Sequence, residues 1–421
     1  MMSFDAVLAN LPPDRREWTG PALARRVTSV AGCPTGGVDT WVKARRASGG
    51  HVIALNACEA SLGDTPEHIL EAAAMACRSS RLQRYTPAAG LPELREAVAA
   101  SGARQHGVDI SAAQVVITSG GKQGVLDALN AVVDPGDEVL IPSPYWPVYP
   151  AMVELANGRP VSVPAAMAKG FKVTVDQLDA AVSPRTTAVV LCSPCNPTGV
   201  VYTPGELRAI GEWARDEDLW VICDEAYEHL VYDGAVASSL TALAPEVPER
   251  CIVLGGVAMA YAMTGWRVGW LIAPSRVARA IEDFQSNATS HAPNVAQAAA
   301  VAALEGGMAP VERLRTELDR RRRRLCGALD GLPGVELVEP QGALYAFPSV
   351  ESYLGGVLGG RLMSTTIELC AALFERAEVA TMPGEAFGRL GHLRISFAVP
   401  EEDLDEGISR LSRCLGEIAV P

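Results

Sequence analysis

The sequence predicts an α/β protein with a mainly parallel sheet flanked by helices, joined to a smaller α+β domain. Short apolar runs, mostly separated by helical stretches, occur at 114–118, 138–141, 188–192, 220–223, 252–254 and 268–272. Buried strands that alternate with helices are typical of a parallel sheet covered on both faces. After Gly306 the pattern changes, because a long Arg-rich helix is expected over 311–329 and strands at 343–347 and 392–397.

The domain organisation follows from these patterns. The chain has 421 residues, more than one typical core accommodates. We expect residues 1–50 to form an N-terminal arm that is part of the small domain. Residues 51–305 would form the large domain and 306–421 the C-terminal small domain.

Composition and charge exclude several classes of protein. Hydrophobic residues make up 48% and charged residues 20% of the chain, which is a globular composition. The net charge of −13 argues against a nucleic-acid partner, since such proteins need positive surface. No run approaches the roughly 20 apolar residues of a membrane span. The opening Met-Met-Ser-Phe-Asp lacks the pattern of a signal peptide, so we expect a cytoplasmic protein.

Lysine is rare in this chain. Lysine occurs only at 43, 122, 169 and 172, so few positions can supply an amine nucleophile. Cys192 and Cys195 form a C-x-x-C pair, but no second pair or nearby His completes a zinc set, and no metal site is expected.

The run of arginines at 320–324 lies near Glu317 and Asp319, and helical spacing predicts a solvated face.

Two loops suggest an anion site and a polar pocket. Gly121 and Lys122 follow a strand and open a helix, where unpaired N–H groups favour a phosphate, although a tight turn alone would explain the glycines. Asp224 ends the strand at 220–223, so it should point to a ligand beyond the carboxyl end of the sheet, with Tyr227 one turn further on. Asn196 lies in a loop shaped by prolines and a glycine.

Two arginines extend this set. Arg267 follows Thr264-Gly265-Trp266, and Arg394 lies within the apolar strand expected at 392–397. An arginine in an apolar strand must be paired, commonly with a carboxylate or phosphate, and a structural salt bridge is the alternative.

Over about residues 50–400 the chain resembles the class I/II aminotransferases, which are fold-type-I enzymes dependent on pyridoxal phosphate (PLP). The resemblance rests on ordered motifs: YTPAAG from Tyr85, SGGKQ from Ser119, PGDEV from Pro135, PYW from Pro144, NPTG from Asn196, DEAY from Asp224, MTGWR from Met263 and LRIS from Leu393.

The resemblance implies roles for the individual residues of these motifs. Asp224 would pair with the pyridine nitrogen of the cofactor, Tyr227 and Asn196 would bond the 3-hydroxyl oxygen, and Trp146 would stack on the ring. Gly121, Lys122 and Arg267 would hold the phosphate, helped by Tyr85 from the partner subunit of a homodimer. Arg394 would bind a substrate α-carboxylate. The charged roles agree with the chemistry, since they place a cation on a phosphate, a carboxylate on a pyridinium and an arginine on a carboxylate.

The chain departs from the family pattern at two positions. The family's Schiff-base lysine lies eight residues before the arginine of the Thr-Gly-Trp-Arg motif, and here that residue is Met259. Methionine cannot form an imine or carry the α-proton, so ordinary transamination should be severely impaired. Where the family usually has Gly-Glu-Pro-Asp-Phe, the chain has Cys58-Glu59-Ala60-Ser61-Leu62, so Cys58 would reshape the substrate pocket.

These features leave four interpretations open. We favour an aminotransferase-like enzyme that binds PLP or pyridoxamine phosphate (PMP) noncovalently and acts on an amino acid or keto acid. Tyr227, Cys58, Lys122 or His229 would then be the candidate base. The alternatives are a cofactor-independent enzyme in the same pocket, a non-enzymatic ligand-binding relative, and an engineered Lys-to-Met variant.

Overall fold

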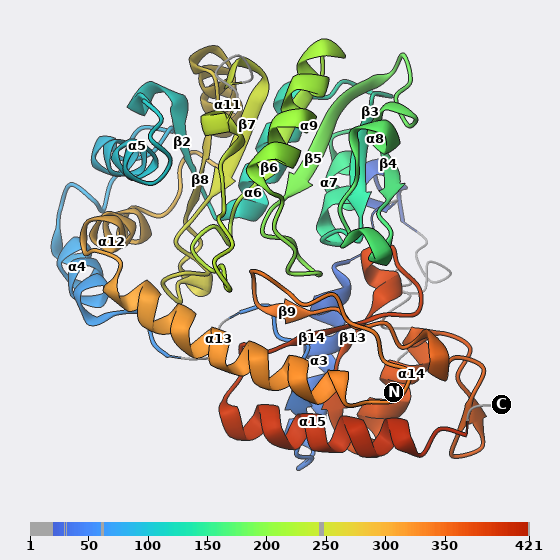
Figure 1. Cartoon of the computed structure of the whole chain (residues 1–421). Helices are drawn as coiled ribbons and strands as arrows, with labels where there is room; N and C mark the ends of the chain where they lie inside the picture. Colours follow the sequence, from blue (N-terminus) through green and yellow to red (C-terminus); the bar gives the residue numbers. More distant parts are fainter. Residues whose placement is uncertain (1–19, 29, 31, 60–62, 244–247, 420–421) are drawn as a thin grey trace.

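The computed structural model describes residues 20–28, 30, 32–59, 63–243 and 248–419. Figure 1 shows a larger part built on a sheet flanked by helices and a smaller part below it. The sheet has seven strands in the order β2-β8-β7-β6-β5-β3-β4. Its strands are β2 (Val115–Thr118), β3 (Glu138–Ser143), β4 (Arg159–Pro164), β5 (Thr186–Cys192), β6 (Trp220–Asp224), β7 (Cys251–Gly255) and β8 (Gly269–Ile272). Neighbours from β7 to β4 pair in parallel, while β8 is antiparallel to both β2 and β7. The predicted α/β class with a mainly parallel sheet is confirmed.

Both faces of this sheet are covered by helices. Alternate residues of one strand point to opposite faces: Val190 packs in one hydrophobic cluster with α6, α7 and α11, and Val189 in another with α8, α9 and α10. The helices of the larger part are α4 (Glu67–Arg78), α5 (Pro92–His106), α6 (Gly121–Val132), α7 (Val148–Leu155), α8 (Val175–Asp179), α9 (Pro204–Asp216), α10 (Leu240–Leu243), α11 (Ser275–Ala288) and α12 (Asn294–Glu305). The two-sided cover explains the continuous apolar runs seen in the sequence.

The smaller part contains an antiparallel sheet in the order β13-β14-β9 and long helices that pack on it (Figure 1). Its strands are β9 (Tyr345–Ala346), β13 (Met382–Pro383) and β14 (Leu393–Ser396), with the short pairs β1 (Ile53–Ala54) with β12 (Val379–Ala380) and β10 (Val357–Leu358) with β11 (Arg361–Leu362). Its helices are α3 (Pro34–Ala47), α13 (Ala309–Asp330), α14 (Thr366–Ala372) and α15 (Glu401–Gly416), and α2 (Arg25–Thr28) precedes them. Val38 and Val42 of α3 share one core cluster with residues 343–418. The boundaries at residues 50 and 305 stay a prediction.

The arginine run of α13 differs from its predicted solvated face. Arg322 is fully buried and Arg321 is 9% exposed. The Arg322 guanidinium pairs with Asp233, Asp319 and Glu339 and donates to the carbonyl of Pro340. The prediction was wrong for these two residues, because one side of the run faces the protein, where carboxylates of α13 and of other segments pair with it. In the part of the chain that the structure describes, no helix is long and apolar enough to cross a membrane.

Candidate functional site

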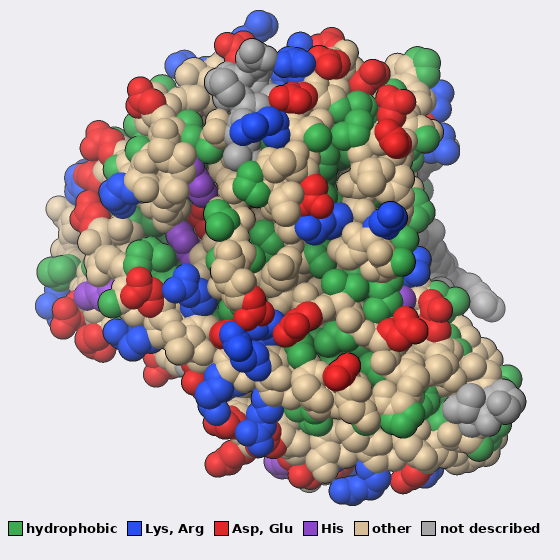
Figure 2. All heavy atoms as spheres, viewed as in Figure 1, with side chains coloured by type: hydrophobic (Ala, Val, Ile, Leu, Met, Phe, Trp, Pro, Cys, Tyr) green, Lys and Arg blue, Asp and Glu red, His purple; other side chains and the backbone are tan. Residues whose placement is uncertain are grey.

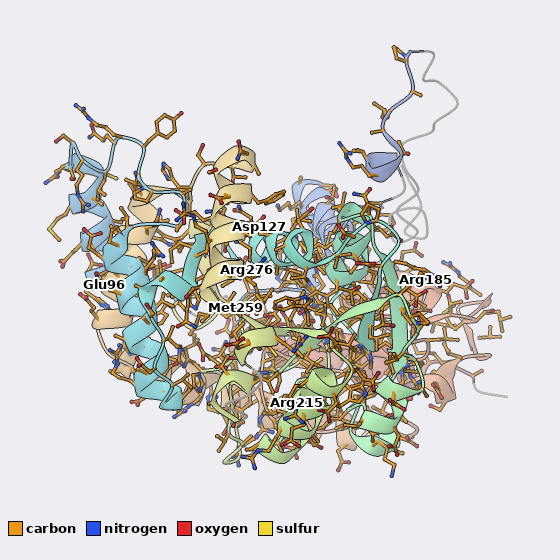
Figure 3. All side chains as sticks on the ribbon, turned by 90° about the horizontal axis from the view of Figure 1, so that it is seen from above. Glu96, Asp127, Arg185, Arg215, Met259 and Arg276 are labelled. Carbon is orange, nitrogen blue, oxygen red and sulfur yellow. The ribbon has the colours of Figure 1, made fainter. Side chains whose placement is uncertain are left out.

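A cavity of about 720 Å³ lies where the carboxyl ends of the parallel strands meet the smaller part. Its walls come from the segments that follow β1, β3, β5, β6 and β7, and from the start of α6. Residues of α3 and β9 complete them. Figure 3 labels Met259 near the middle of the molecule, whereas Arg185 and Arg215 lie further out. Polar and charged residues of the wall are Asp39, Lys43, Arg46, Asn56, Cys58, Glu59, Lys122, Tyr149, Cys192, Asn196, Asp224, Tyr227, Thr264, Arg267 and Tyr345.

One end of the cavity is built for an anion. Gly121 begins α6, so the first N–H groups of that helix have no partner within it. The guanidinium of Arg267 is held beside them, because its Nη1 donates to the carbonyl of Thr264 (2.9 Å) and its Nη2 to the carbonyl of Ser119 (3.2 Å). Gly120 has a φ of +82°, and a Cβ there would collide with the Arg267 guanidinium. Positive charge and free N–H groups therefore converge at this end.

The cavity also contains a group of negative charge, the carboxylate of Asp224. Asp224 is 9% exposed and accepts hydrogen bonds from the Tyr149 hydroxyl (2.6 Å) and the backbone N–H of Ala226 (3.1 Å). Burial raises the pKa of this carboxyl above its ordinary value. In the described part of the chain, no lysine or arginine pairs with it, so a cationic ligand group would stabilise its charge.

Two tyrosines link the larger and smaller parts at the cavity. The Tyr227 hydroxyl lies 3.1 Å from that of Tyr345, which is in β9. Burial raises the pKa of Tyr227 well above its ordinary value, with the nearby Tyr345 adding to the effect. Tyr227 therefore stays protonated near neutral pH and can donate a hydrogen bond into the cavity, but it is a weak base.

Arg394 of β14 lies directly behind the wall. It is fully buried, and its Nη1 donates to Asn196 Oδ1 (3.1 Å), while Nη2 donates to the carbonyl of Asn56 (2.9 Å) and to Cys58 Sγ (3.0 Å). Its guanidinium carbon lies 4.3 Å from the centre of the Tyr345 ring. Among the residues that the structure describes, none is a hydrogen-bond partner of the buried Nε. A buried guanidinium without a carboxylate partner would gain from binding one.

The structure brings most of the sequence-predicted residues together. Those that line the cavity are Cys58, Gly121, Lys122, Trp146, Asn196, Asp224, Tyr227, Met259 and Arg267. Arg394 joins them through Asn196 and Cys58. Tyr85 is 89% exposed and does not line the cavity of its own chain. His229 does not line it either; its ring contacts Gln105 and Glu228.

Sequence reasoning missed several residues of the site, and three of them stand out. Tyr149 holds Asp224, Tyr345 contacts both Tyr227 and Arg394, and Lys43 reaches the wall from α3. Tyr149 lies in the first turn of α7 and Tyr345 in β9, and neither position has a local pattern that distinguishes it from a residue of the core. Their roles depend on contacts between distant segments, which local patterns do not reveal.

These features fit the cofactor that the sequence resemblance implies. PLP carries a phosphate, a ring nitrogen that can be protonated and an aromatic face. The start of α6 and Arg267 suit the phosphate, and the buried Asp224 suits the protonated ring nitrogen. Trp146 in the wall suits the aromatic face. The cavity has room for such a ligand together with a small amino acid.

Comparisons with known proteins agree with this assignment of fold. Residues 51–411 match the model of the family described as aminotransferase class I and II. The chain is 46% identical over 409 residues to an aspartate aminotransferase of Streptomyces avermitilis, covering 97% of this chain and 99% of that one. Its structure is similar to the crystal structure of an aspartate aminotransferase from Rhizobium meliloti, with a TM-score of 0.91, 35% identity, and coverage of 95% and 100%. It is also similar to an aspartate aminotransferase from Thermus thermophilus with maleate, with a TM-score of 0.88, 36% identity, and coverage of 94% and 100%.

Proposed function

The chain belongs to the class I and II aminotransferase family, and from that premise we propose that it binds PLP or PMP without a covalent bond and acts on an amino acid or keto acid. Its reaction would differ from ordinary transamination, because Met259 takes the place of the family's lysine. The observation that carries this proposal is that Met259 lines the same cavity as Asp224 and Arg267. The cavity thus retains groups suited to the cofactor's ring and phosphate beside a side chain that cannot bond to it.

The residues of the cavity would bind the cofactor at several points. Gly121, Lys122 and Arg267 would hold the phosphate, helped by Tyr85 of a second copy, and Trp146 would face the ring. Asp224 would accept a hydrogen bond from the protonated ring nitrogen, while Tyr149 keeps the carboxylate in place. Asn196 and Tyr227 would bond the ring hydroxyl. When bound, the cofactor supplies an electron sink for charge that develops at the amino-acid α-carbon.

Proton transfer would be slow at this site, because Met259, Tyr227 and Cys58 are poor bases. A thioether such as that of Met259 has no proton to exchange near neutral pH. Tyr227 holds its proton firmly, as its raised pKa indicates. Cys58 would be a poor substitute for a lysine amine while its sulfur accepts a hydrogen bond from Arg394. Because acid–base catalysis typically contributes about 10²–10⁴ in rate, transamination should be slower by a similar factor.

Substrate recognition would centre on Arg394. Its guanidinium would bind the α-carboxylate in a bidentate manner, exchanging some of its present contacts with Asn196 and Cys58. The side chain of the substrate is not specified by this interaction. We also propose that the protein is a cytoplasmic homodimer in which Tyr85 serves the neighbouring site.

The proposal is tested by transamination between aspartate and 2-oxoglutarate with added PLP. We compare the wild type with Met259→Lys and with Met75→Lys, which adds a lysine at a position that is 67% exposed. The expected result is a rate at least about 10²-fold higher for Met259→Lys than for the other two proteins. Equal rates for the wild type and Met259→Lys would contradict the proposed divergence.

Turnover assays also test two of the alternatives. Turnover of amino or keto acids that is unchanged after vitamin B6 compounds are removed would support a cofactor-independent enzyme. Absence of turnover with every amino and keto acid tested, despite bound ligand, would support a non-enzymatic ligand-binding protein.

A further inference from the structure

The turn after β6 has a second polar side that the cavity does not use. Asp224 and Tyr227 line the cavity, whereas Glu225 and Glu228 do not. Backbone hydrogen bonds from Glu225 N–H to the carbonyl of Leu254 and from Glu228 N–H to the carbonyl of Glu225 hold this turn in place. The two glutamates meet the C-terminal residue of α5, His106.

His106, Glu225 and Glu228 form a compact cluster of potential metal ligands. Each can offer one nitrogen or oxygen atom, and these three atoms lie within 4.8 Å of one another. His106 Nε2 is 3.0 Å from Glu228 Oε2. Ligands at 2.0–2.2 Å from a tetrahedral zinc ion are separated by roughly 3.3 Å, so only small side-chain movements would be needed.

The charge of this cluster favours a cation. Glu225 is 7% exposed, and among the described residues no lysine or arginine pairs with it. Its carboxyl lies close to that of Glu228, and Ser239 and the backbone of Leu240 also reach it. Two crowded carboxylates with little solvent are a costly arrangement unless positive charge lies between them.

A further histidine lies beside the cluster. His229 Nε2 lies 3.7 Å from Glu228 Oε1, on the oxygen opposite to the one that contacts His106. Gln105 Nε2 lies 3.3 Å from His229 Nε2. Because the Gln105 amide donates to this nitrogen, His229 is a neighbour of the cluster and not a hydrogen-bond donor to Glu228. Figure 2 shows histidine side chains, in purple, reaching the surface beside the region that α5 forms.

We propose that His106, Glu225 and Glu228 bind one divalent transition-metal ion, with zinc as the best match, at a site separate from the cavity. One imidazole and two carboxylates suit zinc and leave a fourth position for water. Bound metal would join the end of α5 to the turn that carries Asp224 and Tyr227. The alternative is that His106 and Glu228 form a simple ion pair with no metal.

The test measures zinc binding by the full-length chain after treatment with a chelator. We titrate zinc against a chromogenic indicator and measure the metal content after desalting, for the wild type, Glu228→Gln, His106→Gln and the control His51→Gln, an exposed histidine elsewhere. One zinc per chain is expected for the wild type and the control. Each cluster variant should weaken binding at least about 100-fold, since even residues that only orient ligands account for 10–100-fold.

Two further observations complete the test. Magnesium in large excess should not displace zinc, because it prefers an all-oxygen octahedral site. Zinc should raise the Tm of the wild type and the control, but not of the two cluster variants, and circular dichroism of the metal-free proteins checks that each variant is folded. The proposal is overturned if the wild type retains no zinc, or if the control and the cluster variants bind it equally. Neither result depends on whether the cavity binds PLP.

Discussion

Cys58 uses part of the hydrogen-bonding capacity of Arg394, the guanidinium proposed to bind the substrate carboxylate. Its sulfur accepts from Nη2, which also donates to the carbonyl of Asn56. The sequence resemblance implies a glycine at this position in the family, and a glycine would leave that direction open. A single side chain can therefore set how readily the carboxylate is accepted.

Cys58→Gly should therefore tighten the binding of a small dicarboxylate such as maleate. The expected decrease in Kd is about 2–10-fold, the effect of one ordinary hydrogen bond that no longer competes. Calorimetric titration of the PMP-supplemented protein measures it, with Cys77→Ser, a change at an exposed thiol, as the control. Unchanged or weaker binding by Cys58→Gly would show that the thiol does not compete for Arg394.

Asp127 makes the stability of the protein depend on pH. It is 2% exposed, accepts a hydrogen bond from Gln123 Nε2 (3.1 Å), and burial raises its pKa to about 6. Between about pH 4 and 6 the folded state then binds more protons at this site than the unfolded state, so the free energy of unfolding falls as pH rises. The loss is about 2–3 kcal/mol, from a pKa difference of about 2.

Asp127→Asn should remove this dependence. Its free energy of unfolding at pH 7 should exceed that of the wild type, and the difference should disappear toward pH 4. Urea unfolding at several pH values measures both. A wild-type curve that rises from pH 4 to 6 while the variant's stays flat would show that the sign is wrong.

At the scale of the elements, local sequence patterns predicted six strands of the seven-stranded sheet. They missed β4, which pairs only with β3 and has a half-exposed pattern with prolines at both its second and last positions. An edge strand tolerates such prolines and lacks the apolar run that marks a buried strand.

The sequence also did not predict the burial of Arg322 in α13, because its partners Asp233 and Glu339 come from segments outside the helix.

Arg322 should contribute strongly to the anchoring of α13. Arg322→Met removes the buried cation and its hydrogen bonds, although Asp233 and Asp319 stay partly exposed and keep Arg323. We therefore expect a loss of about 1–3 kcal/mol in the free energy of unfolding. The matched control is Arg324→Met, which removes an exposed pair with Asp405 and should cost less than about 1 kcal/mol. Denaturant unfolding of both variants compares them, and similar losses would contradict the importance of burial.

At the scale of the whole molecule, the cavity exists because the two parts meet. Asp224 comes from the sheet, while Tyr345 and Arg394 come from the smaller part, and hydrogen bonds such as Arg394 to Asn56 join residues far apart in the chain. Motif residues beside glycine or proline turns could be predicted from the sequence and its family resemblance. The supporting contacts of Tyr149 and Tyr345 could not, since they arise only when distant segments pack together.

The exposure of Tyr85 has a consequence for assembly. A side chain that is 89% exposed and does not line its own cavity is available to a second copy. We expect sedimentation to show a dimer, and Tyr85→Phe to weaken the binding of PLP about 2–10-fold while the chain stays folded, because one phosphate hydrogen bond is lost. A protein that is monomeric at assay concentration, yet binds PLP equally with and without the Tyr85 hydroxyl, would contradict the shared site.

The central claim is that a cavity without its lysine still holds the cofactor. The most direct measurement is an absorbance spectrum together with an intact mass after PLP is added and the protein is desalted, for the wild type and for Met259→Lys. The account predicts that the wild type retains a vitamin B6 chromophore with no increase in its denatured mass after borohydride reduction, whereas Met259→Lys gains the mass of the cofactor. A chromophore retained only by Met259→Lys would contradict the account and favour a cavity that no longer uses the cofactor.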